Sequence, residues 1–208
     1  ALMLQAVGLS CRRGERRLFS DLNVKVEPGT LLAVVGENGS GKTSLLRIFS
    51  SLLPPEEGSV LWDGQDIHQL KEFYAGQLTY LGHLNGIKDD LTPLENLMSA
   101  TSLAGEPCSN NGAKEALEAI GLKRPIHHLP SKVLSQGQKR RVTLARLWLS
   151  TRPLWLLDEP FTSLDAASTN VVTQRLLAHV QRGGLAVLVT HQEVALPAER
   201  LQYLRLAG

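Results

Sequence analysis

The sequence predicts an α/β fold in which short buried strands alternate with helices. Three apolar runs, at residues 31–35, 154–157 and 185–190, have the length of buried strands, and each is followed by polar residues. A glycine-rich turn follows the first run and leads into residues 44–49, which predict a helix. A strand, a turn and a helix thus follow one another as in an α/β unit.

The glycine-rich turn at residues 36–43, hereafter the phosphate loop, matches the pattern Gly, four residues, Gly-Lys-Ser/Thr. Its glycines allow backbone torsions that a Cβ forbids, so successive N–H groups can face one phosphate. Lys42 supplies a full charge for the outer phosphates of ATP, and the Thr43 hydroxyl is suited to bind Mg²⁺. The alternative is a glycine turn before an ordinary helix, but every fixed position of the motif is filled. The predicted nucleotide-binding residues here are Gly36, Asn38, Gly39, Ser40, Gly41, Lys42, Thr43 and Ser44.

Upstream of the phosphate loop, residues 2–7 and 18–26 predict two strands. Between them lies a charged turn at 11–17 that contains four arginines. Arginines this close together usually form a solvated loop, but this turn precedes the phosphate loop, where a base could rest. Downstream, a turn at 54–58 leads into a short predicted strand at 59–64.

The chain is long enough for a substantial core and predicts a single domain over residues 1–208. From Leu78 a strand breaks into a loop, after which helical patterns dominate. Thr92 as N-cap and Pro93 at the first helical position predict the start of one helix. We expect a core of residues 1–82 and 151–208 with a helical insert at about 83–150.

Composition limits the classes of partner. The 22 basic and 20 acidic residues give a formal net charge of +2, so no overall field favours nucleic acid. The apolar runs are far shorter than the ~20 residues that span a bilayer, and the first residues do not form a signal peptide, so we expect a cytoplasmic protein. Its two cysteines, Cys11 and Cys108, fit neither a disulfide framework nor a metal site.

Two later strands end in groups suited to ATP chemistry. Asp158 and Glu159 follow the run at 154–157, and two carboxylates at a strand end are costly unless a cation such as Mg²⁺ neutralises them. Pairing with arginines is the alternative, but the phosphate loop elsewhere in the chain favours the metal. His191 follows the run at 185–190. Alone it would be structural or solvated, but the three strand ends together predict one site.

Residues 134–138, Leu-Ser-Gln-Gly-Gln, form a polar, glycine-bearing helix start, hereafter the signature segment. From physical chemistry alone, such a helix start can bind an anion but does not indicate which one. The signature segment lies between the phosphate loop and Asp158 in the sequence. With its motifs in this order, nearly the whole chain resembles the nucleotide-binding subunits of ATP-binding cassette (ABC) proteins. The resemblance implies a P-loop NTPase of the ABC type: a RecA-like mixed sheet core, an antiparallel β subdomain and an inserted α-helical subdomain.

The resemblance also implies catalytic roles. Asp158 would hold Mg²⁺ through water, Glu159 would act as general base on the attacking water, and His191 would contact the γ-phosphate. Lys42 completes the implied catalytic set. Mechanistically this is phosphoryl transfer to water, in which positioning and charge neutralisation carry most of the rate.

A second copy of the chain is the implied partner. Ser135, Gly137 and Gln138 of the signature segment would close over ATP held by the other subunit. Asp165 lies in a segment that resembles the loop communicating across such dimers. The active unit would then be a dimer of cassettes with two shared ATP sites.

Two positions depart from the ABC pattern. The aromatic residue that usually stacks on adenine corresponds to Arg13, so Arg13 or its neighbour Arg12 would have to stack its guanidinium plane instead. The usual glutamine at the start of the helical insert corresponds to Leu84, which cannot bind Mg²⁺ or orient water. Either His83 or Asn85 substitutes for it, or coupling to the partner is altered.

Within the ABC proteins, the chain most resembles the ATPase subunits of bacterial cytochrome c maturation systems. The runs that carry this resemblance are residues 80–83, 86–88, 91–97, 145–149 and 158–162, together with Trp155. It implies transmembrane subunits as partners, contacted through about residues 83–97, and a peripheral place on the cytoplasmic face of the inner membrane. No residue distinguishes haem from another cargo, so a cassette of a different transporter and a nucleotide-gated scaffold with little turnover stay as alternatives.

Overall fold

The computed structural model describes residues 2–207, which form two compact units. The first unit contains the residues up to 80, residues 152–159 and those from 177 on. The second contains residues 81–151 and 160–176. The stretch 160–176 thus lies in the unit that holds most of the helices, whereas the sequence analysis assigned it to the core. The assignment of subdomain boundaries stays a prediction.

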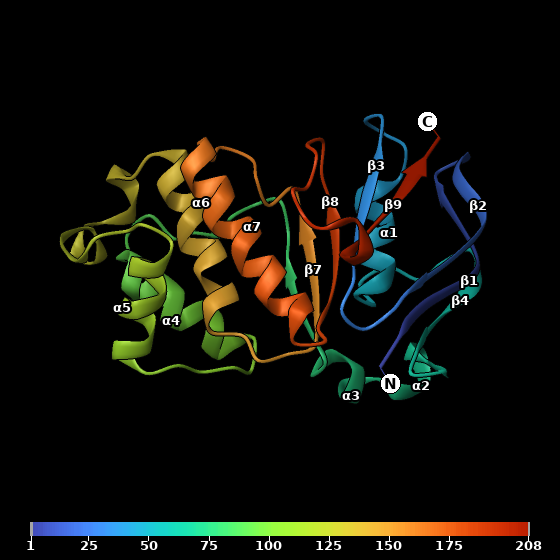
Figure 1. Cartoon of the computed structure of the whole chain (residues 1–208), viewed down its shortest axis with the longest axis horizontal. Coiled ribbons are helices and arrows are strands. Elements are labelled where there is room, and N and C mark those ends of the chain that lie inside the picture. The colour runs from blue at the N-terminus through green and yellow to red at the C-terminus, as the bar shows by residue number, and fades with distance from the viewer. Residues whose placement is uncertain (1, 208) are drawn as a thin grey trace. The chain divides into compact units, whose positions relative to one another are not determined.

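The first unit contains an antiparallel sheet in the order β2-β1-β4-β5 (Figure 1). Its strands are β1 (Leu4–Arg13), β2 (Arg16–Val26), β4 (Glu57–Trp62) and β5 (Gln65–Asp66). The strands predicted at 2–7, 18–26 and 59–64 are therefore present. The turn predicted at 11–17 is wrong in extent, because β1 and β2 pair through most of these residues and leave only Gly14 and Glu15 as the turn. Gly58 is required where β4 crosses β1, because a Cβ at this position would collide with the carbonyl oxygen of Gly8.

The second sheet has the order β6-β7-β8-β3-β9. The pairs β7/β8, β8/β3 and β3/β9 are parallel, so these strands end at one edge of the sheet. The strand bounds are Leu31–Gly36 for β3, Leu78–Leu81 for β6, Leu154–Asp158 for β7, Leu185–Val189 for β8 and Leu201–Leu206 for β9. The three apolar runs are confirmed as strands, and β7 and β8 are buried throughout. The sequence analysis did not predict β9.

Helix α1 (Lys42–Phe49) connects the phosphate loop to the hydrophobic core of the first unit. Leu45, Leu46, Ile48 and Phe49 are buried among residues of both sheets. The Tyr74 hydroxyl donates a 2.5 Å hydrogen bond to the carbonyl oxygen of Phe49, and burial raises the pKa of Tyr74. The end of α1 is thereby fixed from outside the helix, which positions its start at the phosphate loop.

The second unit is mainly helical, as the sequence predicts (Figure 1). Thr92 is confirmed as the N-cap, and Glu95 completes a capping box with it: Glu95 N–H donates to Thr92 Oγ1 over 3.1 Å, and Thr92 N–H donates to Glu95 Oε1 over 3.0 Å. The longer helices of the chain beside α1 are α4 (Pro93–Leu103), α5 (Asn110–Ala119), α6 (Gln136–Leu144) and α7 (Ala166–Gln181). The short ones are α2 (Ile67–Leu70), α3 (Glu72–Ala75) and the 3₁₀ turns Arg124–His128, Ser131–Val133, Ala145–Trp148 and Ala198–Arg200.

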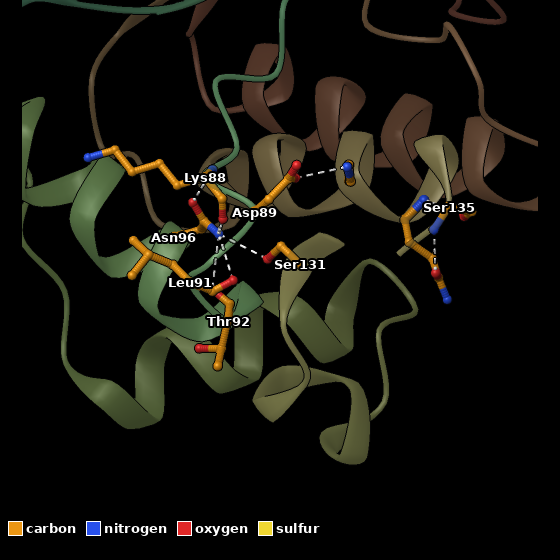
Figure 2. Close-up of polar contacts among 9 residues, drawn as sticks. Lys88, Asp89, Leu91, Thr92, Asn96, Ser131 and Ser135 are labelled. Carbon is orange, nitrogen blue, oxygen red and sulfur yellow. Dashed lines mark hydrogen bonds and ion pairs between the residues drawn. The ribbon is translucent and has the colours of Figure 1, made fainter. Parts of the chain in front are cut away.

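A buried asparagine holds together the loop that precedes α4 (Figure 2). Asn96 Oδ1 accepts from the Lys88 N–H at 2.9 Å. Its Nδ2 lies 3.0–3.3 Å from four acceptors, namely the carbonyl oxygens of Lys88, Leu91 and Thr92 and the Ser131 hydroxyl. One side chain therefore satisfies backbone groups of a segment without regular secondary structure.

Replacing Asn96 with alanine should lower the free energy of unfolding by about 3 kcal/mol, because the backbone groups of Lys88, Leu91 and Thr92 lose a buried side-chain partner. Urea denaturation followed by circular dichroism measures this. Asn111→Ala is the matched control, since this exposed asparagine bonds only to the Glu115 side chain. Equal stability of the two variants would contradict the role assigned to Asn96.

Candidate nucleotide site

The phosphate loop adopts a conformation that requires glycine at three positions. Gly36, Gly39 and Gly41 have φ of 153°, 80° and 98°. A Cβ on Gly36 would lie 2.5 Å from the carbonyl oxygen of Leu206, and one on Gly41 would lie 3.0 Å from Leu18 Cβ. The backbone therefore has β9 and β2 as close neighbours, and no side chain would fit between them.

The interior of the phosphate loop contains unused hydrogen-bonding capacity. The Ser40 hydroxyl is buried and has no hydrogen-bond partner within residues 2–207. Gly41, the N-cap of α1, offers no side-chain acceptor to the first N–H groups of the helix. Lys42 Nζ donates to the carbonyl oxygens of Gly36 and Glu37 over 2.5 and 3.1 Å. These donors fit an anion such as a phosphate chain.

The end of β7 lies against the start of α1. The Thr43 hydroxyl donates to Asp158 Oδ2 over 3.1 Å, although the residues are 115 positions apart in the sequence. Asp158 is buried. A hydroxyl beside a buried carboxylate is the kind of donor set that holds Mg²⁺ beside a phosphate, so the predicted metal pair fits this geometry.

Glu159 and His191 lie next to each other at the same edge of the sheet. His191 Nε2 lies 2.9 Å from Glu159 Oε1. Glu159 adopts a left-handed φ of 53°, and its N–H donates to the carbonyl oxygen of Val189 at 2.8 Å. A non-glycine residue in this conformation costs of order 1–3 kcal/mol, and such strain is concentrated at functional sites. The first unit thus brings together five predicted residues, namely Lys42, Thr43, Asp158, Glu159 and His191.

The remaining predicted residues lie in the second unit. Ser135 and Gln138 form a second capping box at the start of α6: Gln138 N–H donates to Ser135 Oγ over 3.1 Å, and Ser135 N–H donates to Gln138 Oε1 over 2.9 Å (Figure 2). A Cβ on Gly137 would lie 2.7 Å from the carbonyl oxygen of Ser163. Helix α6 and the segment before α7 therefore approach closely, and only glycine permits it.

Asp165 has a local structural role. Its Oδ1 accepts the Ser168 N–H at 2.7 Å, at the start of α7. This hydrogen bond lowers the pKa of the Asp165 carboxyl below its usual value. The side chain fixes the turn that leads from Ser163 into the helix.

The two departures from the ABC pattern have different surroundings. Arg12 Nε lies 2.8 Å from Glu56 Oε1, so this arginine already has a carboxylate partner. Leu84 is 78% exposed, and the side chain of neighbouring Asn85 accepts from Arg140 Nη1 at 3.1 Å. Of the two proposed substitutes for the missing glutamine, Asn85 is therefore engaged within its own unit.

Residues of β9 that lie beside His191 were not predicted from the sequence. A groove of about 470 Å³ there is lined partly by Tyr203 and Arg205 of β9. An apolar alternation as short as that of β9, with polar residues at 202, 203 and 205, gives only a weak strand signal.

Comparison with known proteins decides the family. The model of the ABC transporter family matches residues 19–162. The chain belongs to the ABC transporter family. Within this family it is 52% identical over 204 residues to a "Cytochrome c biogenesis ATP-binding export protein CcmA" of Dechloromonas aromatica, covering 98% of this chain and 100% of the relative. A relative with the same name in Nitrosospira multiformis is 48% identical and 98% covered on both sides.

Solved ABC structures share the fold. The dimeric bacterial ABC transporter cassette MJ0796 superposes with a TM-score of 0.81 at 25% identity, covering 97% of this chain and 94% of the cassette. A further structure of the same cassette, in a post-hydrolysis state, is bound to ADP and phosphate. As for membrane crossing, no helix within residues 2–207 is both long enough and apolar enough for it.

Replacing Gly137 with alanine should destabilise this ABC protein by about 1–3 kcal/mol, because the new methyl group overlaps the Ser163 carbonyl oxygen. Differential scanning calorimetry measures the loss. Gly76→Ala serves as control, since Gly76 has a φ of −74° and a Cβ there would meet nothing closer than 3.5 Å. A Gly137→Ala protein as stable as the parent would show that α6 and the segment before α7 do not pack this closely.

Proposed function

We propose that this chain is the ATP-hydrolysing subunit of an ABC membrane complex for cytochrome c biogenesis, acting in haem export or in release of haem from its periplasmic chaperone. Relatives named for cytochrome c biogenesis, 44–52% identical over almost their whole length, support the biological role. The observation that carries the ATPase chemistry is the convergence of Thr43, Asp158, Glu159 and His191 beside the phosphate loop.

Each residue of this cluster has a role that its surroundings support. Lys42 and the loop N–H groups bind the outer phosphates of ATP, while Thr43 and Asp158 hold Mg²⁺. This metal would supply positive charge that neutralises the phosphate oxygens as the bond between ADP and the γ-phosphoryl group breaks. Glu159 takes a proton from the attacking water, and His191, 2.9 Å away, orients this carboxylate and contacts the γ-phosphate. Contacts from the remaining loop residues, and from Arg13 toward the base, complete the nucleotide site.

We further propose that two copies of the chain act as a dimer of cassettes. In each site, Ser135, Gly137 and Gln138 of one copy would close over the nucleotide held by the other, with Asp165 in the segment that links the two sites. The dimeric form of the similar cassette MJ0796 supports this arrangement. The capping box of Ser135 and Gln138 supports it as well, because it presets the start of α6 before any nucleotide binds.

The membrane partners are the transmembrane subunits of the same complex, which places the chain peripherally on the cytoplasmic face of the inner membrane. Contact is proposed through residues 83–97. Within this segment Leu84 exposes 78% of its surface, an apolar side chain where solvent would favour a polar one.

Glu159→Gln should lower kcat of the assembled complex on the order of 10²–10⁴-fold, because the amide cannot accept the proton of the attacking water. ATP binding should persist and trap an ATP-bound dimer, detectable by light scattering. Glu27→Gln, at an exposed position between β2 and β3, is the control. Turnover by Glu159→Gln at the parent rate would refute the assignment, and ATP binding without turnover in the parent complex would favour a nucleotide-gated scaffold.

Lys42→Ala should abolish c-type cytochrome formation in cells that depend on this chain, since the loop then lacks its charge for the outer phosphates. Haem staining of membrane and periplasmic proteins measures covalent haem attachment. Lys25→Ala, on the exposed face of β2, is the matched control. Normal haem attachment with Lys42→Ala would instead support a different transporter as the partner.

A further inference from the structure

The four arginines of the β1–β2 hairpin differ in whether a carboxylate lies close enough to neutralise their charge. Across the hairpin Arg12 is paired with Arg17 and Arg13 with Arg16. Arg12 and Arg17 both approach Glu56 Oε1, at 2.8 and 3.7 Å. The side chains of Arg13 and Arg16 make no hydrogen bond and no ion pair with any residue from 2 to 207. Two exposed guanidinium groups thus lack a carboxylate partner.

Arg16 lies against the phosphate loop. A Cβ on Gly39 would be 3.6 Å from Arg16 Nη1. Arg17, the next residue of the strand, points instead toward Glu56, as expected when neighbouring strand residues face opposite sides. The strand register therefore places Arg16 on the side of β2 opposite to Arg17, with its guanidinium near Gly39.

The strand that carries Arg16 is itself fixed to the loop. Leu18 Cβ and Phe19 Cδ2 would lie 3.0 and 3.1 Å from a Cβ on Gly41. The register between β1 and β2 shifts at this point, where Cys11 pairs with Phe19 but Arg12 pairs with Arg17. Such a bulge re-aims side chains, and here two consecutive residues approach one glycine. Strand β2 consequently runs beside the loop from Gly39 to Gly41.

The charge on Arg16 complements what the loop is built to bind. Lys42 is 7% exposed and lies within the loop, bonded to the carbonyl oxygens of Gly36 and Glu37. It supplies one charge, whereas a triphosphate carries several. A guanidinium at the outer side of the loop offers a fork of N–H donors that matches phosphate oxygens.

We propose that Arg16 is a second triphosphate-binding cation of the nucleotide site, with its guanidinium donating to phosphate oxygens of the bound nucleotide. The proposal rests on the proposed ATPase function and deepens it. In this proposal Arg16 binds the phosphate chain of the nucleotide, and Arg13 is the arginine that contacts the base.

The test compares dissociation constants of the full-length parent, Arg16→Ala, Arg16→Lys and Arg17→Ala for MgATP, MgGTP and magnesium tripolyphosphate. Isothermal calorimetry at low and high salt provides the readout, and circular dichroism confirms folding. Arg16→Ala should weaken all three ligands about tenfold at low salt, with a smaller factor at high salt. Arg16→Lys should lose less, because it keeps the charge but not the fork. Arg17→Ala should stay within about twofold, since its charge is directed to Glu56.

Three results would overturn the proposal. Parent-like binding by Arg16→Ala would remove it while leaving the ATPase proposal intact. Loss of ATP affinity with unchanged tripolyphosphate affinity would assign Arg16 to the base. A parent chain that binds none of the three ligands, either alone or in its membrane complex, would overturn the proposed function and this inference with it.

Discussion

The site depends on the parallel order β7-β8-β3, which brings residues from distant parts of the sequence to one edge of the sheet. The hydrogen bond between Thr43 and Asp158 spans 115 positions and joins the start of α1 to the end of β7. Because the strands run parallel, their carboxyl ends coincide, and the loops that follow them share one location. A one-residue slip of β7 would turn Asp158 to the opposite face and remove it from Thr43.

Close packing inside the first unit maintains this order. Trp155, three residues before Asp158, stacks on His179 with ring centroids 3.7 Å apart and planes inclined by 5°. His179 Nε2 also lies 2.9 Å from the carbonyl oxygen of Leu185, where β8 begins. A Cβ on Gly184 would occupy the position of this imidazole ring. The imidazole thus contacts both β7 and β8, and the strained φ of Glu159 is held at the other end of the same strand pair.

Much of the site could be predicted from local patterns. The phosphate loop, the carboxylates after β7 and the capping box at Thr92 are each specified by consecutive residues, so they need no tertiary information. Strand β9 was not predicted, because its mixed polar and apolar residues give no clear strand pattern. Only its pairing with β3 in the structure identifies it as a strand. The surroundings of the hairpin arginines could not be predicted for a related reason. The sequence pointed to Arg13 or Arg12 for the base, but only the register of β1 with β2 shows that Arg12 and Arg17 lie near Glu56 and Arg16 does not.

In the second unit, side chains of α6 link the signature segment to the segment that contains the exposed Leu84. The loop that contains Leu84 is bound to α6 at both ends. Arg140 donates to the Gly82 carbonyl oxygen at 3.2 Å, and Lys139 forms a 3.0 Å ion pair with Asp89 (Figure 2). Helix α6 begins at the capping box of Ser135, so this loop and the signature segment belong to one bonded network. The Asn96 network adds hydrogen bonds inside the loop and joins it to Ser131.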